Sequence, residues 1–187
     1  SGGPWDLTII TTDVDSTVRF NQAVGTALGL NDLNLTNAGQ VVFASAANVL
    51  LSGSLLQNGT GGLETSADFN VTYDMTFNGP VTLGATTPPG GLTLTAGDEI
   101  TFNSTLDGSH DLILNATGTT TFVGAVGSIH RIGDGIAEAL TIDSSGPTIF
   151  QSTVRTNSGI SQFNDSGRIT FQSDVNLAAG DTSSTFF

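Results

Sequence analysis

The chain contains two histidines, and each follows a recurring phenylalanine at the same distance. His110 lies eight residues after Phe102, and His130 lies eight residues after Phe122. In equivalent turns of a repeat the two imidazoles come close together, and imidazoles with carboxylates can ligate a transition-metal ion. We nevertheless expect no catalytic or metal site, because His110 also fits an exposed turn and a longer loop after Phe122 moves His130 elsewhere. The candidate ligands of the alternative are His110, His130, Asp107 and Asp111.

Paired carboxylates in turns also offer oxygen ligands for calcium. Calcium takes six or more oxygens from a defined loop, and the chain has neither the EF-hand spacing nor the Gly-Gly-x-Gly-x-Asp repeat. We therefore expect solvated acidic turns that keep the protein soluble, and no cofactor, with calcium binding as the alternative. The pairs in question are Asp13 with Asp15, Asp98 with Glu99, and Asp107 with Asp111.

Several classes of enzyme lack their residues in this chain. It has no Cys, which removes disulfides, zinc-thiolate sites and thiol catalysis. Gly-x-Ser-x-Gly, a phosphate-binding loop and His-Glu-x-x-His are also missing. We expect no enzyme. The alternative is a carbohydrate-active β-helix of the polysaccharide-lyase kind, or a carbohydrate-binding module; the first would need carboxylates aligned with one of Arg19, Arg131, Arg155 and Arg168.

The charge balance limits the partners. Of 187 residues, 17 are Asp or Glu and only four are basic, all of them Arg, so the net charge is -13. Such a chain has no basic surface for nucleic acid and is repelled by an anionic membrane. No apolar run approaches the roughly 20 residues of a membrane helix. We expect no nucleic-acid binding and no direct membrane insertion.

The elements that must position these side chains are strands. Gly, Ser, Thr and Asn are abundant and helix formers are scarce, which favours an all-β protein. An apolar residue stands four positions after each of seven phenylalanines and two positions before five of them. The second residue after the phenylalanine is mostly small, and the pattern predicts half-buried strands. The residue after five of them is Asn or Gln, as in Asn78 and Asn103, and can form an amide ladder. The seven are Phe20, Phe43, Phe77, Phe102, Phe122, Phe150 and Phe171.

A second strand, often Leu-x-Leu, begins ten residues before four of these phenylalanines. Length varies after the phenylalanine instead, which predicts loops at 25–32, 82–91 and 127–139 on one edge, and a larger loop or degenerate coil at 51–68. The shortest unit is 20 residues, from Phe102 to Phe122. Two strands and two turns fill that length, and such units must stack to bury their phenylalanines. We predict one parallel β-helix (β-solenoid) domain over 1–187, with about seven irregular coils; the alternative is a β-sandwich.

Segments such as Ile100 to Gly108, followed by Asp111 to Ala116, resemble repeats of filamentous-haemagglutinin-like adhesins and giant autotransporter-type proteins of bacterial surfaces. The resemblance is of repeat style and covers most of residues 7–187. An Asn-Pro-Asn motif of the two-partner export domain is missing, so the chain corresponds to a repeat region. The resemblance implies an extracellular, non-enzymatic, elongated scaffold, with host or matrix glycans as further partners.

The ends predict self-association. The chain begins at Ser1, as after removal of a signal peptide or in a fragment, and the spacing from Ile10 to Phe20 makes Leu7 to Ile10 a second-half strand. Unpaired edge strands recruit other chains unless they are capped. We expect head-to-tail pairing with another copy or with the next repeat of a longer parent; the alternative is a monomer whose last residues fold back. The pairing residues are Leu7, Ile9, Ile10, Thr185, Phe186 and Phe187.

Overall fold

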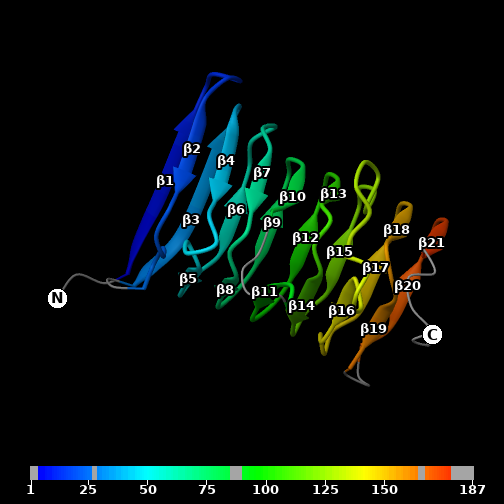
Figure 1. The fold of residues 1–187 in the computed structure, drawn as a ribbon. Coiled ribbons are helices and arrows are strands. Elements are labelled where there is room, and N and C mark those ends of the chain that lie inside the picture. Colours follow the sequence, from blue (N-terminus) through cyan, green and yellow to red (C-terminus); the bar gives the residue numbers. More distant parts are fainter. Residues whose placement is uncertain (1–3, 27–28, 85–89, 164–166, 178–187) are drawn as a thin grey trace.

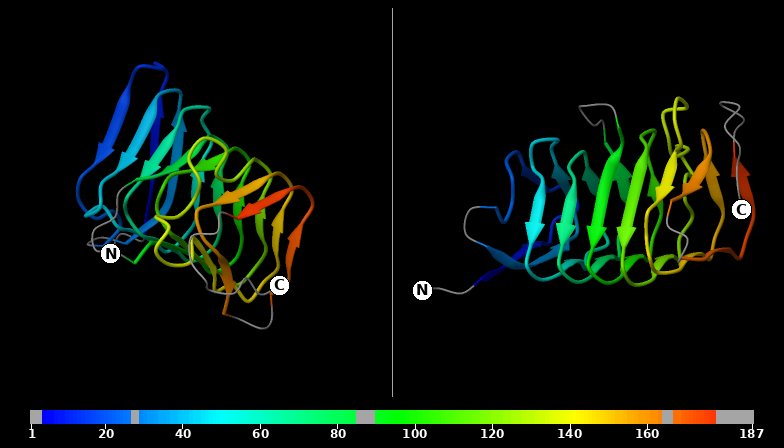
Figure 2. Two further views of the ribbon diagram at one scale, coloured as in Figure 1. Left: turned by 45° about the vertical axis from the view of Figure 1, so that its right-hand side comes forward. Right: turned by 90° about the horizontal axis from the view of Figure 1, so that it is seen from below.

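The computed structural model describes residues 4–26, 29–84, 90–163 and 167–177, which form strands and no helix. The chain winds in about seven turns, and the strands of successive turns lie side by side along one axis (Figures 1 and 2). Every described strand pair is parallel, and the partner is the equivalent strand of the next or the previous turn. The predicted β-solenoid is therefore confirmed over the β-sandwich, whose hairpins would pair antiparallel.

Each full turn contributes three short strands, not the two predicted, so the strands form three stacks. Stack A contains β5 (Val49–Leu51), β8 (Phe69–Val71), β11 (Leu92–Ala96), β14 (Leu112–Ala116), β16 (Leu140–Ile142) and β19 (Ile160–Gln162). Stack B contains β1 (Trp5–Thr11), β3 (Leu30–Asn37), β6 (Leu55–Gln57), β9 (Met75–Phe77), β12 (Ile100–Phe102), β15 (Thr120–Phe122), β17 (Thr148–Phe150) and β20 (Ile169–Phe171).

Stack C contains β2 (Thr17–Phe20), β4 (Gln40–Phe43), β7 (Leu63–Thr65), β10 (Val81–Leu83), β13 (Leu106–Asp107), β18 (Val154–Thr156) and β21 (Val175–Leu177). Single bridges through Val126 connect β13 to β18. The chain runs through each turn from stack B to C to A, and the three connections are the B–C, C–A and A–B corners. The start of β3 also pairs with β5, so stacks A and B join there.

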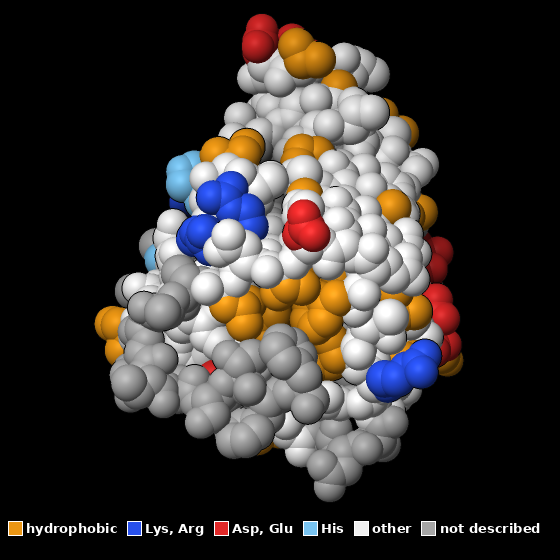
Figure 3. Space-filling model, turned by 90° about the vertical axis from the view of Figure 1, so that its right-hand side faces the viewer, with side chains coloured by type: hydrophobic (Ala, Val, Ile, Leu, Met, Phe, Trp, Pro, Cys, Tyr) orange, Lys and Arg blue, Asp and Glu red, His pale blue; other side chains and the backbone are white. Residues whose placement is uncertain are grey.

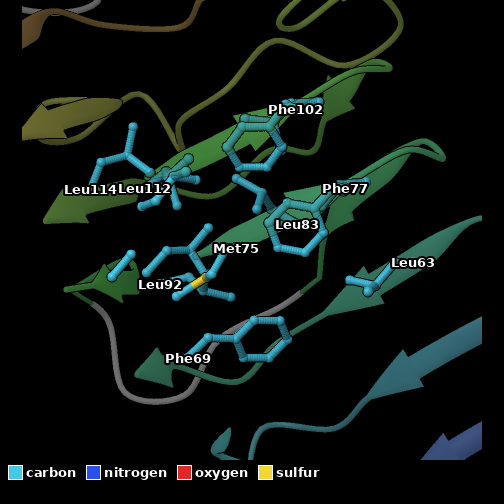
Figure 4. Close-up of a cluster of buried hydrophobic side chains, with 14 of the residues drawn as sticks. Leu63, Phe69, Met75, Phe77, Leu83, Leu92, Phe102, Leu112 and Leu114 are labelled. Carbon is cyan, nitrogen blue, oxygen red and sulfur yellow. The ribbon is translucent and has the colours of Figure 1, made fainter. Parts of the chain in front are cut away.

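The core is a column of inward side chains, because most strands alternate buried and outward residues. Its clearest feature is a ladder of stacked rings with centroids 4.6–4.9 Å apart and planes within 15° of parallel. That distance matches the spacing of hydrogen-bonded strands, about 4.8 Å, so each ring sits directly on the next. Figure 4 shows Phe77 and Phe102 in the core beside Met75 and Leu83. The ladder comprises Phe77, Phe102, Phe122, Phe150 and Phe171.

Phe20 and Phe43 do not belong to this ladder, so the predicted single series of seven phenylalanines is wrong. They stack on each other in stack C, with ring centroids 4.6 Å apart. The next position of stack C is Thr65, and the position before Phe77 in stack B is Gln57. The interval from Phe43 to Phe77 is long because it crosses from one stack to another, and no large loop occupies it.

Gln57 fills the core position that phenylalanine takes in the next turn, and it is completely buried. Its Nε2 donates to the Asn37 side chain and to the carbonyls of Gly59 and Gly61. Its Oε1 accepts from the backbone N–H of Gly79 at 2.7 Å. A buried amide with all these partners avoids the cost of an unsatisfied polar group, which explains why an apparently degenerate coil keeps its place in the stack.

The small residues two positions after the phenylalanines lie at the B–C corner, not inside a strand. β12 ends at Phe102 and β13 begins at Leu106, so the chain turns between them. A Cβ on Gly124 at this corner would lie 2.3 Å from the Ser104 carbonyl of the previous turn. The predicted amide ladder runs along this corner, because Asn103 Nδ2 donates to Asn78 Oδ1 and Asn78 Nδ2 donates to Asn58 Oδ1.

The ring ladder predicts a large cost for removing one ring. Phe102 is 1% exposed and stacks on both Phe77 and Phe122. We expect Phe102→Ala to lower the free energy of unfolding by about 3–5 kcal/mol, since both the transfer energy and the cavity act. Thr101→Ser on the outward face of the same strand is the control, and chemical denaturation measures both. Equal effects of the two changes would contradict the assigned inward and outward faces.

Candidate functional site

The candidate ligands all lie at the C–A corner. The strands constrain two of the predicted loops, because β3 already begins at Leu30 and β10 continues to Leu83. The prediction that the three loops share one edge is wrong, because the bridge between Val24 and Val49 places Gly25 directly after stack A, at the A–B corner.

The segment 127–139 is the longest described loop at the C–A corner and carries His130. It is not wholly external, because Ile132 and Ala139 are buried and Ile132 bridges to Thr156 of β18.

Asp107 fixes the beginning of this loop. Asp107 is the last residue of β13 and is only 5% exposed. Asp107 Oδ1 accepts the backbone N–H groups of Ile129 at 2.7 Å and His130 at 3.2 Å, and Oδ2 accepts the Ser128 hydroxyl at 3.1 Å. A carboxylate with three donors from one loop is an intramolecular cap, because charge-assisted hydrogen bonds hold the loop backbone in place.

Asp111 has the same role at the other end of the loop. Its Oδ1 accepts the backbone N–H of Asp134 at 3.2 Å, and the His110 carbonyl accepts the N–H of Gly133 at 3.1 Å. Burial raises the pKa of the Asp111 carboxyl above its ordinary value of 3.8. The hydrogen bond from Asp134 opposes that rise in pKa, and the nearby Asp134 and Glu138 carboxylates add to it.

The four candidates thus share one corner, as the repeat spacing predicts. In the described part of the chain, no three His, Asp or Glu side chains lie close enough to hold a metal ion. Both carboxylates are engaged by the backbone of the 127–139 loop. These hydrogen bonds attach the 127–139 loop to the preceding turn.

Other acidic residues also accept backbone N–H groups, mostly from the following turn. Asp32 accepts the N–H of Ser54 at 2.8 Å, and Asp68 accepts that of Thr93 at 2.8 Å. Asp74 accepts the N–H of Glu99 at 3.1 Å. Asp13, one of the residues considered for calcium, accepts the N–H of Asp15 within its own turn at 2.9 Å. The sequence signal for the turn-to-turn contacts is an acidic residue 22–25 positions before the donor.

Two arginines tie the loop to the last described turn. Arg131 donates to the carbonyls of Thr156 and Asn176, each at 3.0 Å, and also to the Asn176 side chain. Arg155 donates to the Ser128 carbonyl at 3.0 Å. Figure 3 shows arginine side chains gathered beside histidine on the C-terminal end. These contacts engage both guanidinium groups with oxygen atoms of the chain itself.

Both ends of the solenoid leave apolar residues partly open. Figure 3 shows hydrophobic side chains grouped on the C-terminal end, where the inward residues of β20 and β21 are only half-buried. Leu7, Ile9, Val18 and Phe20 are likewise half-buried at the N-terminal end. An apolar pocket of about 330 Å³ also opens there. It is lined by Trp5, Leu7, Ala23, Val24, Gly25, Thr26, Gly29 and Leu30.

The predicted pairing residues are placed differently from one another. Leu7 and Ile9 point inward and align with Leu33 and Leu35 of the next turn. Ile10 is 67% exposed on the outer face, so the spacing that aligned Ile10 with Leu33 is wrong by three residues. The first B–C corner is three residues longer than the second, between β3 and β4, which produced the false match. Thr185, Phe186 and Phe187 lie outside the described residues.

Comparisons with protein-family models, with curated proteins and with solved structures find no match to this chain. No helix with the length and hydropathy needed to span a membrane occurs in the described ranges. The geometry of the corners and of the two ends is therefore what carries the functional argument.

The cap formed by Asp107 predicts local protection of the loop. Asp107→Ala removes the acceptor for the Ile129 and His130 amides, and each unsatisfied group costs about 1–3 kcal/mol. We expect faster hydrogen exchange at these two amides, measured by NMR or mass spectrometry, and lower stability. Asp15→Ala, an exposed carboxylate on a different corner, is the control. Unchanged exchange at Ile129 and His130 would show that the loop does not depend on this carboxylate.

Because the pKa of Asp111 is raised, replacing its carboxyl group by an amide should change the free energy of unfolding by an amount that depends on pH. A carboxyl whose pKa rises on folding contributes stability below its unfolded pKa and loses that contribution as pH rises through the folded value. Asp111→Asn keeps the Oδ1 acceptor and removes the titration. We expect the variant to gain stability relative to the parent chain between about pH 3 and pH 7. Urea unfolding at about pH 3 and about pH 7 measures the free energies of both proteins. A difference between variant and parent that is the same at both pH values would contradict the prediction.

Proposed function

We propose that this chain is a structural or adhesive repeat module of an extracellular fibre, similar in role to the repeat regions of filamentous-haemagglutinin-like surface proteins. The observation that carries the proposal is the partial burial of apolar residues in the first and last described strands. A further turn can pair the edges of these strands and cover those residues. A module that continues at both ends is a segment of a longer column, supplied either by copies of the chain or by adjacent repeats.

The charge and composition support an extracellular place for this module. The chain carries a net charge of -13 with no Lys, and its outward strand positions are largely Thr, Asn and Ser. Such a surface stays hydrated and gives no attachment to nucleic acid or anionic lipid. The repeat style of Ile100 to Gly108 agrees with this location.

The exposed aromatic residues favour a second candidate, carbohydrate binding. Trp5 is 66% exposed and Tyr73 is 57% exposed, and aromatic rings are the usual platforms for sugars. Trp5 lies at the start of stack B and Tyr73 lies at an A–B corner two turns further, so they do not form one platform. A glycan array tests this candidate directly, and a specific signal lost in Trp5→Ala or Tyr73→Ala would favour it.

A tandem chain tests the structural module. Two complete copies joined in one polypeptide place the C-terminal end of the first beside the N-terminal end of the second. In a repeat protein each added interface stabilises its neighbours, so we expect the tandem chain to unfold at a higher temperature than the single chain. Calorimetry measures this. Two halves that unfold at the temperature of the single chain would contradict the proposal, as would turnover of a polysaccharide.

A further inference from the structure

We propose that Arg131 and Arg155, with His130 beside them, form a binding site for an acidic sugar, one that carries a carboxylate or a sulfate group. The inference rests on the adhesive part of the proposed function and adds the place of binding and the chemical class of the ligand. The site lies at β18 and the 127–139 loop, and it shares no residue with the exposed Trp5 and Tyr73.

Positive charge gathers at this place in an otherwise acidic chain. The sequence has four Arg and two His against 17 acidic residues, and two of these Arg and one His come together around β18. Figure 3 shows arginine side chains gathered beside histidine on the surface. A local positive patch attracts a small anion, whereas the rest of a chain of net charge -13 repels a long polyanion. The charge pattern therefore favours one acidic sugar over a charged polymer.

The strand register places the two arginines next to each other. Arg155 lies in β18 and pairs with Asn176 of β21. Arg131 reaches across the same strand from the loop, because it donates to the carbonyl of Thr156 and to the carbonyl and the side chain of Asn176. Arg155 reaches the opposite way and donates to the carbonyl of Ser128 in that loop. Both side chains thus span the same gap between the loop and β18.

Both guanidinium groups keep N–H donors for a ligand. A guanidinium has five N–H donors in a planar fork, of which Arg131 uses three and Arg155 uses one in the described structure. The fork matches the oxygens of a carboxylate or a similar oxyanion. The exposed Asn176 adds a further donor, since its Oδ1 accepts from Arg131 and its Nδ2 is left to donate.

The two positive charges have no acidic partner of their own. Within residues 4–26, 29–84, 90–163 and 167–177, no carboxylate forms an ion pair with either guanidinium. Asp107 contacts the hydroxyl of Ser128, but its oxygens also accept the N–H groups of the loop backbone. Like charges held close together repel each other, and an anion bound between the arginines offsets that repulsion.

The surroundings favour a sugar over a small inorganic anion. Arg131 and Arg155 are half-buried and already held by hydrogen bonds, so binding costs little further loss of side-chain freedom. Ile129 is 77% exposed and precedes His130, so an apolar side chain borders the charged group. Sites for small organic molecules combine apolar contact with a few fixed polar groups, and the C–H face of a sugar ring meets both requirements.

Titration with matched monosaccharides tests the class of ligand. Methyl glucuronide carries a carboxylate where methyl glucoside carries a hydroxymethyl group, and the sulfate ester of the glucoside carries a sulfate there. We expect one or both acidic sugars to shift the NMR signals of His130 and Asn176 at millimolar concentrations, and the comparison of the two identifies the preferred group. Equal shifts with the neutral glucoside, no shifts with either acid, or shifts confined to other residues would overturn the proposal.

Two further probes test the remaining parts of the claim. Acetate carries the carboxylate without a ring and should bind more weakly than the glucuronide. Heparin is a sulfated polymer and should bind no more tightly than the sulfated monosaccharide. Acetate that binds as tightly as the glucuronide, or heparin that binds far more tightly, would overturn the assignment of a single acidic sugar.

Variants of equal charge test the residues. We expect Arg155→Gln and Arg131→Gln each to weaken binding of the acidic sugar at least about tenfold, as loss of a charge-assisted pair does. Arg19→Gln removes the same charge from an exposed position in β2 and is the control, which should bind like the parent chain. Arg155→Lys keeps the charge and loses the fork, so it should bind between the two. Equal binding by Arg155→Gln and Arg19→Gln would sink the proposal.

Thermal unfolding of each variant separates lost binding from lost folding. Arg155→Gln removes one hydrogen bond to the loop and should remain folded, even if Arg131→Gln does not. Tyr73→Ala should leave binding unchanged, which distinguishes this site from the aromatic candidate. The titration uses the single chain, so it is independent of the tandem experiment. A tandem chain that gains stability while no acidic sugar binds would leave the structural module standing and this site refuted.

Discussion

Strand-to-strand stacking at one fixed spacing is the constraint on which the rest of the structure depends. Each strand hydrogen-bonds to its equivalent in the next turn, about 4.8 Å away, and the rings of Phe77, Phe102 and Phe122 repeat at 4.9 and 4.8 Å. The aromatic ladder and the backbone ladder therefore reinforce each other. An insertion inside a strand would shift every inward residue to the outer face, so length changes fall at corners, most of all at the C–A corner.

The corners solve a different problem, which is to satisfy backbone groups where strand pairing stops. Acidic residues do much of this work, since Asp32, Asp68 and Asp107 each accept N–H groups of the following turn. In this chain of net charge -13, some of the carboxylates therefore stabilise the contacts between successive turns.

The sequence predicts the stacked β architecture because inward residues repeat at fixed distances, and the ladder of five phenylalanine rings follows from that repeat. The sequence does not separate stacks B and C. The B–C corner between β12 and β13 keeps the same inward and outward alternation as a strand, so Phe102 and Leu106 look continuous. Phe43 lies ten residues after Leu33, the distance that separates Phe102 from Leu92, yet it belongs to stack C. Spacing along the chain does not record at which corner a turn gains residues.

The candidate site shows the same limit. Equal spacing correctly brings His110 and His130 to one corner, but the direction of each side chain depends on how the 127–139 loop folds back. That path depends on Asp107, which accepts the backbone N–H groups of Ile129 and His130, and the spacing of residues along the chain does not reveal this contact. Ile10 fails for a related reason, because the longer first corner shifts the match to Leu7.

The distribution of charge and apolar surface favours growth in one dimension. The sides of the column carry polar strand faces and most of the acidic residues, so two columns side by side repel each other. The end strands of the described chain instead carry half-buried apolar residues. A head-to-tail contact between identical units does not close on itself when the axis is straight, and successive turns here follow one axis (Figure 2). Association through the ends, as the proposed function requires it, would extend the column without widening it.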